Sequence, residues 1–268
     1  MEYVVRSVLP PAVLAMRRSW VQARRYQRWP RPLKTLRLSR SARLDLLPVS
    51  FDLERGLIVD AGANVGAWSA AVLEMAPDAQ ILAIEPIPHA RRQLALRLAG
   101  SPNVTIEGRA IGRKPGSATF HVTQADHNAS LLKPKPETND LYGWGWEVAE
   151  EIQVDVIDLD SLLAGRDVHL LKVDVQGGER DLLLGAQDTL TRTTAVLIEV
   201  TMFPHYEGDA TFAWLHEHLS EAGFQLSALS QPFLSPAQRI LWMDACYLRP
   251  EVADSHSLLS HYGPGLAG

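Results

Sequence analysis

The chain has 268 residues, which suits one α/β domain with appendages. Hydrophobic residues make up 46% of the chain and charged residues 21%, as in an ordinary globular protein. No apolar run approaches the roughly 18 residues that cross a bilayer, and Arg17 and Arg18 interrupt the N-terminal apolar stretch before a secretory signal forms. Because Cys246 is the single cysteine, no intrachain disulfide can form. We therefore expect a cytoplasmic protein in which Cys246 is a buried structural thiol.

The net charge of −5 is unevenly distributed. Residues 1–45 carry eleven Lys and Arg against two acidic residues, whereas the rest of the chain carries fifteen basic and twenty-nine acidic residues. The apolar residues near the N-terminus are spaced as in amphipathic helices. We therefore expect a basic helical arm over 1–45, a main domain over 46–250 and a tail over 251–268. Such an arm either contacts an anionic membrane surface or nucleic acid, or packs back on the acidic domain.

From Leu57 onward, short apolar runs alternate with helical periodicity, which predicts a mostly parallel α/β sheet with an antiparallel last strand. The expected strands are Leu57–Ala61, Gln80–Glu85, Asn103–Glu107, Val168–Val173, Ala195–Val200, Phe224–Leu229 and Leu241–Leu248. The expected helices are Ala67–Met75, His89–Leu98, Gly178–Gly185 and Thr211–Ala222.

An insertion at about 117–156 interrupts this order. Its expected strands, Ser117–Val122 and Ile152–Val156, flank a polar loop over 123–151, and a loop of this length is usually functional or mobile. The loop contains three aromatic residues separated by glycines: Tyr142, Trp144 and Trp146. They either form a lid over a sugar or apolar acceptor, or fold inward as a local plug.

The most informative motif is LIVDAGANVGAWS, in which an apolar strand ends in Asp60 and a turn from Gly62 to Gly66 opens a helix. Glycines let a backbone pass close to a ligand, and the helix N-terminus offers free N–H groups. Asn64 stands where a dinucleotide-binding turn has its middle glycine. The turn therefore favours a cationic ligand with an amino-acid tail, such as S-adenosylmethionine, over NAD. A tight strand-to-helix connection without a ligand is the alternative.

The next strand ends in Glu85, which is followed by Pro86. An acidic side chain at this strand tip is placed to accept both ribose hydroxyls of a nucleoside, and the stretch 108–112 would then flank the adenine. Alternatively, Glu85 is a surface carboxylate that caps the following helix.

The fourth main strand brings Lys172, Asp174 and Gln176 to one face, near the edge where open α/β sheets bind ligands. Glu199 ends the neighbouring strand. The two carboxylates could activate a hydroxyl, hold a divalent cation or only bind the substrate. The alternative for Lys172 and Asp174 is a purely structural ion pair.

In this order and spacing, the stretches DAGANVGAWS, AIEP, NASL, LKVDVQGGERDLLLGA and LIEV resemble the FkbM-type methyltransferase family, from about Leu57 to Pro250. The resemblance implies a Rossmann-like class I methyltransferase fold, S-adenosylmethionine as donor and O-methylation, often of sugars, glycolipids or polyketide products. The cofactor positions it implies are Asp60, Gly62, Asn64, Gly66, Ser69 and Glu85, to which we add their neighbours Ala63 and Pro86, and Ala110.

The same resemblance places Asp174 at the family's acidic position after the fourth strand. Gln176 departs from the family pattern, which usually has Glu, and this departure argues against a bound metal. Asp155, Asp158 and Asp160 have metal-like spacing, but N-capping of a short helix after them explains the run more simply.

His205 follows the fifth main strand in a loop that faces the substrate, where it is either a general base or a plain loop histidine. His121 and His127, in or near the insertion, are weaker candidates. The expected catalytic residues are therefore Asp174, Glu199 and His205.

Together these features predict an S-adenosylmethionine-dependent O-methyltransferase that acts on a hydroxyl of a sugar, glycolipid or related natural product. One rival is a nucleic-acid methyltransferase that uses the basic arm, but phosphate contacts need a basic face near the site and the domain is acidic. The other rival is a methyltransferase-like interaction module without catalysis.

Overall fold

The computed structural model describes residues 42–48, 51–142 and 145–254. Most of the predicted basic arm and of the predicted tail therefore lies outside the described residues, as does Trp144 of the aromatic loop. Within the described residues, no helix is long and apolar enough to cross a membrane.

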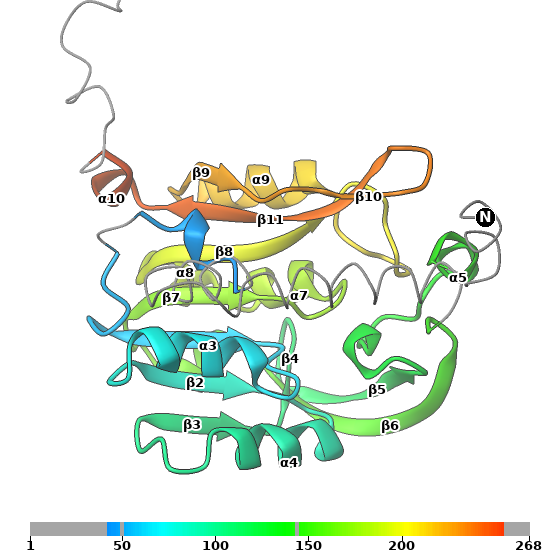
Figure 1. The fold of residues 1–268 in the computed structure, drawn as a ribbon, viewed down its shortest axis with the longest axis horizontal. Coiled ribbons are helices and arrows are strands. Elements are labelled where there is room, and N and C mark those ends of the chain that lie inside the picture. The colour runs from blue at the N-terminus through cyan, green and yellow to red at the C-terminus, as the bar shows by residue number, and fades with distance from the viewer. Residues whose placement is uncertain (1–41, 49–50, 143–144, 255–268) are drawn as a thin grey trace, which may run out of the picture. The chain divides into compact units, whose positions relative to one another are not determined.

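A sheet of eight strands forms the centre of the domain (Figure 1). The strands lie in the order β3-β2-β1-β7-β8-β11, and β11 also pairs with β9 and β10. The five strands from β3 to β8 are parallel, whereas β11 is antiparallel to β8. This arrangement confirms the predicted Rossmann-like sheet with an antiparallel last strand. Their bounds are β1 (Leu57–Ala61), β2 (Gln80–Ile84), β3 (Val104–Glu107), β7 (Val168–Val173), β8 (Thr193–Thr201), β9 (Gln225–Leu229), β10 (Phe233–Leu234) and β11 (Ile240–Leu248).

Helices cover both faces of the sheet. On one face, a 3-10 turn η1 (Leu44–Leu46) and helices α3 (Ala67–Met75) and α4 (Pro88–Arg97) contribute buried side chains such as Leu44, Val72 and Leu94. The opposite face carries α6 (Leu159–Leu163), α7 (Glu179–Leu184), α8 (Gln187–Thr191) and α9 (Phe212–Glu221), and a short helix α10 (Pro250–Asp254) follows the last strand. β1 is buried at every position, which explains why its sequence is an uninterrupted apolar run apart from Asp60.

The predicted insertion is a separate three-stranded sheet. β5 (Gly116–Thr123) and β6 (Val148–Ile157) pair antiparallel, as predicted, and the short strand β4 (Ala110–Ile111) pairs with β6. The intervening loop contains a 3-10 turn η2 (Asp126–Asn128) and a helix α5 (Pro136–Tyr142), which the sequence did not predict. Backbone hydrogen bonds join this segment to the loop after β8, including one from Lys135 N–H to the His205 carbonyl at 2.9 Å.

The sequence also missed α8 and β10, and β6 begins four residues before its predicted start. All other predicted elements end within two residues of their observed limits. Cys246 is fully buried in β11, as predicted.

Candidate active site

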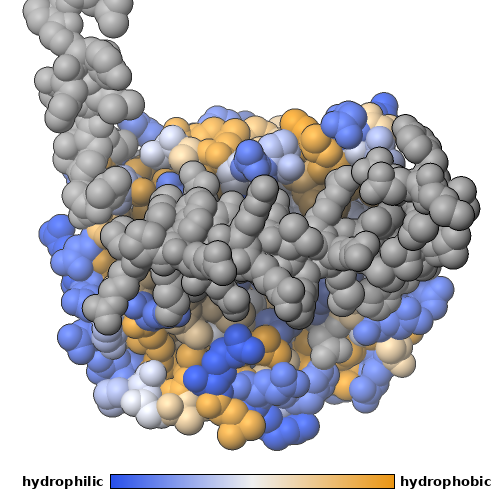
Figure 2. All heavy atoms as spheres, viewed as in Figure 1, coloured by the Kyte–Doolittle hydropathy of each residue, from blue (hydrophilic) through white to orange (hydrophobic). Residues whose placement is uncertain are grey.

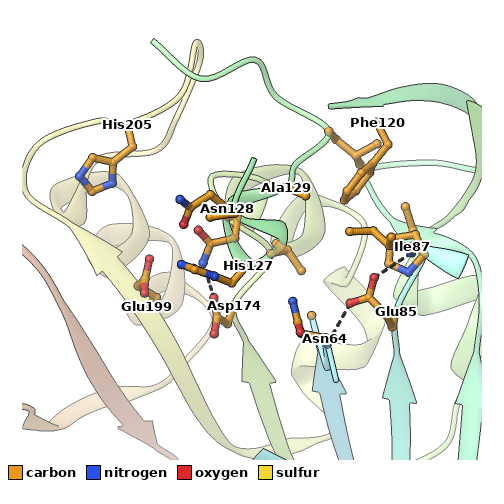
Figure 3. Close-up of a pocket in the computed structure, with 18 of the residues that line it drawn as sticks. Asn64, Glu85, Ile87, Phe120, His127, Asn128, Ala129, Asp174, Glu199 and His205 are labelled. Atoms are coloured by element: carbon orange, nitrogen blue, oxygen red, sulfur yellow. Dashed lines mark hydrogen bonds between the residues drawn. The ribbon is translucent and has the colours of Figure 1, made fainter. Parts of the chain in front are cut away.

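A cavity of about 470 Å³ lies at the carboxyl ends of the parallel strands, where open α/β sheets bind ligands. Figure 3 shows Glu85 on one side of it and Asp174, Glu199 and His205 on the other. The predicted site residues that line the cavity are Gly62, Asn64, Glu85, Pro86, Ala110, Asp174, Glu199 and His205. The insertion contributes the roof through residues such as Phe120 and Asn128.

The remaining predicted cofactor residues lie in or beneath the first turn and do not line the cavity. Asp60 is fully buried, and its Oδ2 accepts a hydrogen bond from the Ser69 hydroxyl at 2.6 Å. Ala63 is buried and Gly66 is the N-cap residue of α3. These residues support the turn, and Gly62 and Asn64 of the same turn line the cavity.

Gly62 is required where the turn meets the end of β7. Its φ is +83°, and a Cβ atom there would lie 1.8 Å from the Asp174 carbonyl oxygen. Asn64 also has a positive φ, +47°, and its side-chain oxygen accepts a hydrogen bond from Val65 N–H at 2.6 Å. The turn after β1 therefore packs closely against the backbone that follows β7.

Glu85 is 4% exposed and its carboxylate is fixed by two backbone donors. Asn64 N–H donates to Oε2 at 2.9 Å and Ile87 N–H donates to Oε1 at 2.7 Å. Burial raises the pKa of Glu85, although these N–H groups oppose the shift. Arg91 holds the surrounding loops, because its Nη1 donates to the carbonyl oxygens of Glu85, Pro86 and Gly108 at 3.0 to 3.1 Å.

The wall beside Glu85 is apolar, with Ile84, Ile87, Ala110, Ile111 and Phe120. A fixed carboxylate with free lone pairs beside an apolar wall fits a nucleoside, since the hydroxyls of a ribose need acceptors and a purine base needs apolar contact. The predicted placement of the stretch 108–112 next to the cavity is thus observed for Ala110.

On the other side, Lys172 joins two carboxylates. Its Nζ lies 3.2 Å from Asp60 Oδ1 and 3.3 Å from Asp174 Oδ2, and it donates to the Gly62 carbonyl oxygen at 3.1 Å. Burial disfavours the ammonium, but the Asp174 and Asp60 carboxylates raise the pKa of Lys172 overall. The predicted Lys172–Asp174 ion pair therefore exists, yet the Asp174 side chain is 37% exposed and faces the cavity.

Gln176 lies next to Asp174, in agreement with the predicted cluster. Its Nε2 donates to Asp174 Oδ1 at 2.6 Å, and its Oε1 is 3.0 Å from the Tyr206 hydroxyl. Glu199 lies at the end of β8, directly opposite Asp244 of β11. Burial raises the pKa of Glu199 well above its ordinary value, and the nearby carboxylates of Asp174, Glu179 and Asp244 add to the shift.

His205 is 3% exposed, and its ring is enclosed by aromatic side chains. The Tyr142 hydroxyl lies 2.8 Å from His205 Nε2, and the Trp146 ring centroid lies 5.4 Å from that of His205. Burial lowers the pKa of His205 to about 4. Tyr142 and Trp146 both line the cavity, and their ring centroids lie 5.1 Å apart, so these two rings form part of its wall.

Sequence reasoning missed the contribution of the last hairpin to this wall. Phe233 of β10 and Trp242 of β11 line the cavity and stack on each other at 5.3 Å. Further apolar side chains of the same region are exposed, among them Leu234 and Ile240. Figure 2 shows the molecule from the same side as Figure 1, with apolar residues in orange along its upper edge, where Figure 1 places β9 to β11.

Of the two weaker histidine candidates, one lines the cavity and the other does not. His127 lines the cavity, whereas His121 lies 3.1 Å from Glu151 on the neighbouring strand of the insertion. Asp158 caps α6 by accepting a hydrogen bond from Ser161 N–H at 2.7 Å, which confirms the capping interpretation. In the described part of the chain, no group of three or more His, Cys, Asp or Glu is arranged to hold a metal ion.

Comparison with known proteins identifies the family of the chain. The chain is 29% identical to the 2-O-methyltransferase NoeI of Sinorhizobium fredii over 163 residues, which are 57% of this chain and 66% of NoeI. It is 28% identical to Methyltransferase 1 of Beauveria bassiana over 211 residues, which are 69% of this chain and 78% of that protein. The solved structure of EvdMO1 aligns with 82% of this chain and 43% of its own, at 13% identity and a TM-score of 0.46. The model of the methyltransferase FkbM domain matches residues 60–226, and the chain therefore belongs to the FkbM methyltransferase family.

Proposed function

We propose that this methyltransferase uses S-adenosylmethionine to methylate a hydroxyl oxygen of a sugar, a glycolipid or a related natural product. The observation that carries the proposal is the continuity of one cavity between two chemically different ends. One end has a fixed carboxylate beside an apolar wall, and the other has carboxyl groups, a histidine and aromatic rings.

The donor end would hold S-adenosylmethionine through this chain's own residues. Glu85 accepts the ribose hydroxyls, Ile87 and Ala110 contact the adenine, and the turn at Gly62 and Asn64 faces the amino-acid tail. When bound, S-adenosylmethionine supplies an electrophilic methyl group on a sulfonium. The membership of the FkbM family supports this assignment of the donor.

The acceptor end suits a hydroxylated molecule. Tyr142, Trp146 and Phe233 offer faces on which an apolar surface or a sugar ring packs, and Asp174 offers an ionisable oxygen to a hydroxyl. Much of the rate enhancement would come from holding the acceptor oxygen in line with the methyl group, about 3 Å from it. The name of NoeI, a 2-O-methyltransferase, supports oxygen as the methylated atom.

One experiment tests the proposal directly. The protein is incubated with labelled S-adenosylmethionine and with separated lipid, glycan and RNA extracts, and the fraction that takes up label is recorded. We expect label in glycan or glycolipid. Label in RNA alone would support the nucleic-acid rival, and binding of S-adenosylmethionine without label in any fraction would support a non-catalytic module. The variant Asp174→Asn serves as the control for enzyme-dependent transfer.

We also propose that the enzyme works in the cytoplasm and that its basic segment 1–45 associates with an anionic membrane surface. This proposal rests on the excess of Lys and Arg in that segment, which attracts anionic lipid headgroups.

A further inference from the structure

Asp174 and Glu199 lie at the ends of adjacent strands and both line the cavity, but their surroundings differ. Asp174 receives two stabilising contacts for its ionised form: Lys172 Nζ lies 3.3 Å from Oδ2, and Gln176 Nε2 donates to Oδ1 at 2.6 Å. A cation and an amide N–H both favour a carboxylate over a neutral carboxyl group. Asp174 therefore has a cation on one carboxylate oxygen and an N–H donor on the other.

Glu199 meets mainly other carboxyl groups. Asp244 is its direct cross-strand partner, and Asp174 and Glu179 also act on it electrostatically. The Lys172 ammonium attracts it, but the contacts of this ammonium are with Asp60, Asp174 and a carbonyl oxygen. Glu179 is buried and Glu199 and Asp244 are half-buried, and carboxyl groups that cluster in this way do not all ionise. Lys172 contacts Asp174 and Arg43 contacts Asp244, so Glu199 keeps a proton, as the buried carboxyl group of Glu179 does.

The neighbouring titratable groups on other elements do not reverse this balance. Burial raises the pKa of Asp244, but Arg43 Nε lies 2.7 Å from Asp244 Oδ2 and opposes this shift. His205 is neutral at pH 7, because burial lowers its pKa to about 4. Tyr142 and Tyr206 are neutral as well, because burial raises the pKa of each phenol.

We propose that Glu199 carries a proton at neutral pH and donates it in a hydrogen bond to an oxygen of the acceptor, while ionised Asp174 receives the proton of the hydroxyl that is methylated. This inference rests on the proposed function and assigns different roles to its two carboxyl groups. One carbon–oxygen bond forms and one carbon–sulfur bond breaks with its electron pair left on sulfur. The hydroxyl proton passes to Asp174 and then to solvent, and Glu199 keeps its own proton throughout.

The same geometry removes His205 from the role of base. Its Nε2 is already in a hydrogen bond with the Tyr142 hydroxyl, whichever of the two donates. His205 and Tyr142 instead form part of the wall.

The division of roles specifies a feature of the acceptor. Adjacent strands lie roughly 4.8 Å apart, so a molecule whose hydroxyl reaches Asp174 has its neighbouring atoms next to Glu199. The preferred acceptor therefore has a second oxygen beside the reacting hydroxyl, as in a vicinal diol. A simple alcohol lacks the partner for the Glu199 proton and leaves that donor unsatisfied.

Infrared spectroscopy tests the proton on Glu199 without any ligand. A protonated carboxyl group has a C=O stretch that is separate from the bands of a carboxylate. We expect the wild-type protein at pH 7 to show such a band that Glu199→Gln lacks. Glu150→Gln, which removes an exposed carboxyl group on β6, serves as the control and should leave the band in place. If the Glu199→Gln spectrum loses no protonated carboxyl band, the proposal is overturned, whether or not the protein methylates a glycan.

The role of the proton is tested with labelled S-adenosylmethionine and the extract fraction that takes up label. Glu199→Ala should raise the KM for that fraction about tenfold, because a buried hydrogen bond is lost. Glu199→Gln should recover most of this loss, since its amide still donates, and should lack the fall in kcat/KM at high pH that ionisation of Glu199 causes in the wild type. If Glu199→Ala and Glu199→Gln raise the KM equally, the proposal that Glu199 donates a hydrogen bond to the acceptor is overturned. If no fraction takes up label, the proposed function fails while the infrared result still decides the protonation.

Discussion

The side-chain amide of Gln176 donates a hydrogen bond to Asp174 Oδ1 at 2.6 Å, and the oxygen of the same amide lies 3.0 Å from the Tyr206 hydroxyl. The Tyr206 hydroxyl also lies 2.9 Å from the Asn128 carbonyl oxygen, so the amide joins Asp174 to a residue of the loop after β8 and to the insertion. A glutamate at this position, which the family pattern usually has, would present a second carboxylate to Asp174 instead of an N–H group. In the proposed mechanism, the glutamine instead places an N–H donor on Asp174.

We predict that Gln176→Glu lowers kcat by tenfold or more at pH 7. A carboxylate next to Asp174 disfavours its ionisation, so the acidic limb of the pH–rate profile should move to higher pH. The change is measured as kcat against pH with the labelled extract fraction. Gln187→Glu, on α8 away from the cavity, is the matched control. If the acidic limb of the pH–rate profile is unchanged in Gln176→Glu, Asp174 is not the base in the rate-limiting proton transfer.

We predict that Asp174→Asn reduces turnover by about a hundredfold or more, as expected for loss of a general base. Affinity for S-adenosylmethionine should change little, because the residues assigned to the ribose and adenine lie at the other end of the cavity. Turnover by label transfer and affinity by calorimetry check the two parts. A chelator should leave the wild-type rate unchanged, and a rate that falls with chelator and returns with magnesium would instead indicate a metal held by the carboxyl groups.

The donor end of the site could be predicted from sequence because it depends on local patterns. An acidic residue that ends an apolar strand, as Glu85 does, must lie at the carboxyl edge of a parallel sheet. The turn around Gly62 needs its glycine for the same local reason, a positive φ and a close backbone approach. Lys172, Asp174 and Gln176 also lie together, as predicted, but β7 ends at Val173 and Gln176 has a φ of +56°, so a turn after the strand places Gln176 and strand alternation does not.

The wall at the acceptor end, which includes Tyr142 and Phe233, could not be predicted in the same way, because it depends on contacts between segments that are distant in sequence. Phe233 reaches the cavity only because β10 pairs with β11, and neither strand carries a motif. Tyr142 ends a helix inside a segment with the composition of a polar loop, and that helix is held by bonds to the loop after β8. Asp60 of the first motif is fully buried beneath the turn, and the local sequence pattern does not indicate this depth.

We predict that Glu85→Ala weakens binding of S-adenosylmethionine and of its demethylated product by roughly 1.5–3 kcal/mol, from loss of charged hydrogen bonds. NAD should not bind either protein. Calorimetry measures the affinities. The matched control is Glu107→Ala, because Glu107 ends the neighbouring strand, pairs with Arg109 at 2.8 Å and does not line the cavity. Unchanged affinity in Glu85→Ala would refute the ribose assignment.

We predict that the protein sediments with vesicles that contain anionic lipid at low salt and is released as salt rises, because salt screens the attraction. Replacing Arg17, Arg18, Arg24 and Arg25 with glutamine should greatly reduce sedimentation and leave affinity for S-adenosylmethionine intact. Vesicles of neutral lipid are the control. If the substituted protein sediments as well as the wild type, the segment is not the membrane contact.

The last prediction concerns Glu179, a buried carboxyl group of α7 that does not line the cavity. Burial raises the pKa of Glu179 from 4.5 to about 8, and the Asp209 and Asp174 carboxylates add to the shift. Between these two pH values the folded state holds a proton that the unfolded state has lost, so the free energy of unfolding falls as pH rises from about 4.5 to about 8.

Glu179→Gln keeps an oxygen that can accept the Val175 N–H bond but cannot ionise. Its free energy of unfolding, measured by urea denaturation at pH 5 and pH 8, should therefore differ less between the two conditions than that of the wild type. Glu217→Gln on the exposed side of α9 should retain the wild-type difference. If the free energy of unfolding has the same pH dependence in all three proteins, Glu179 is ionised in the folded state at these pH values. The prediction would then be wrong.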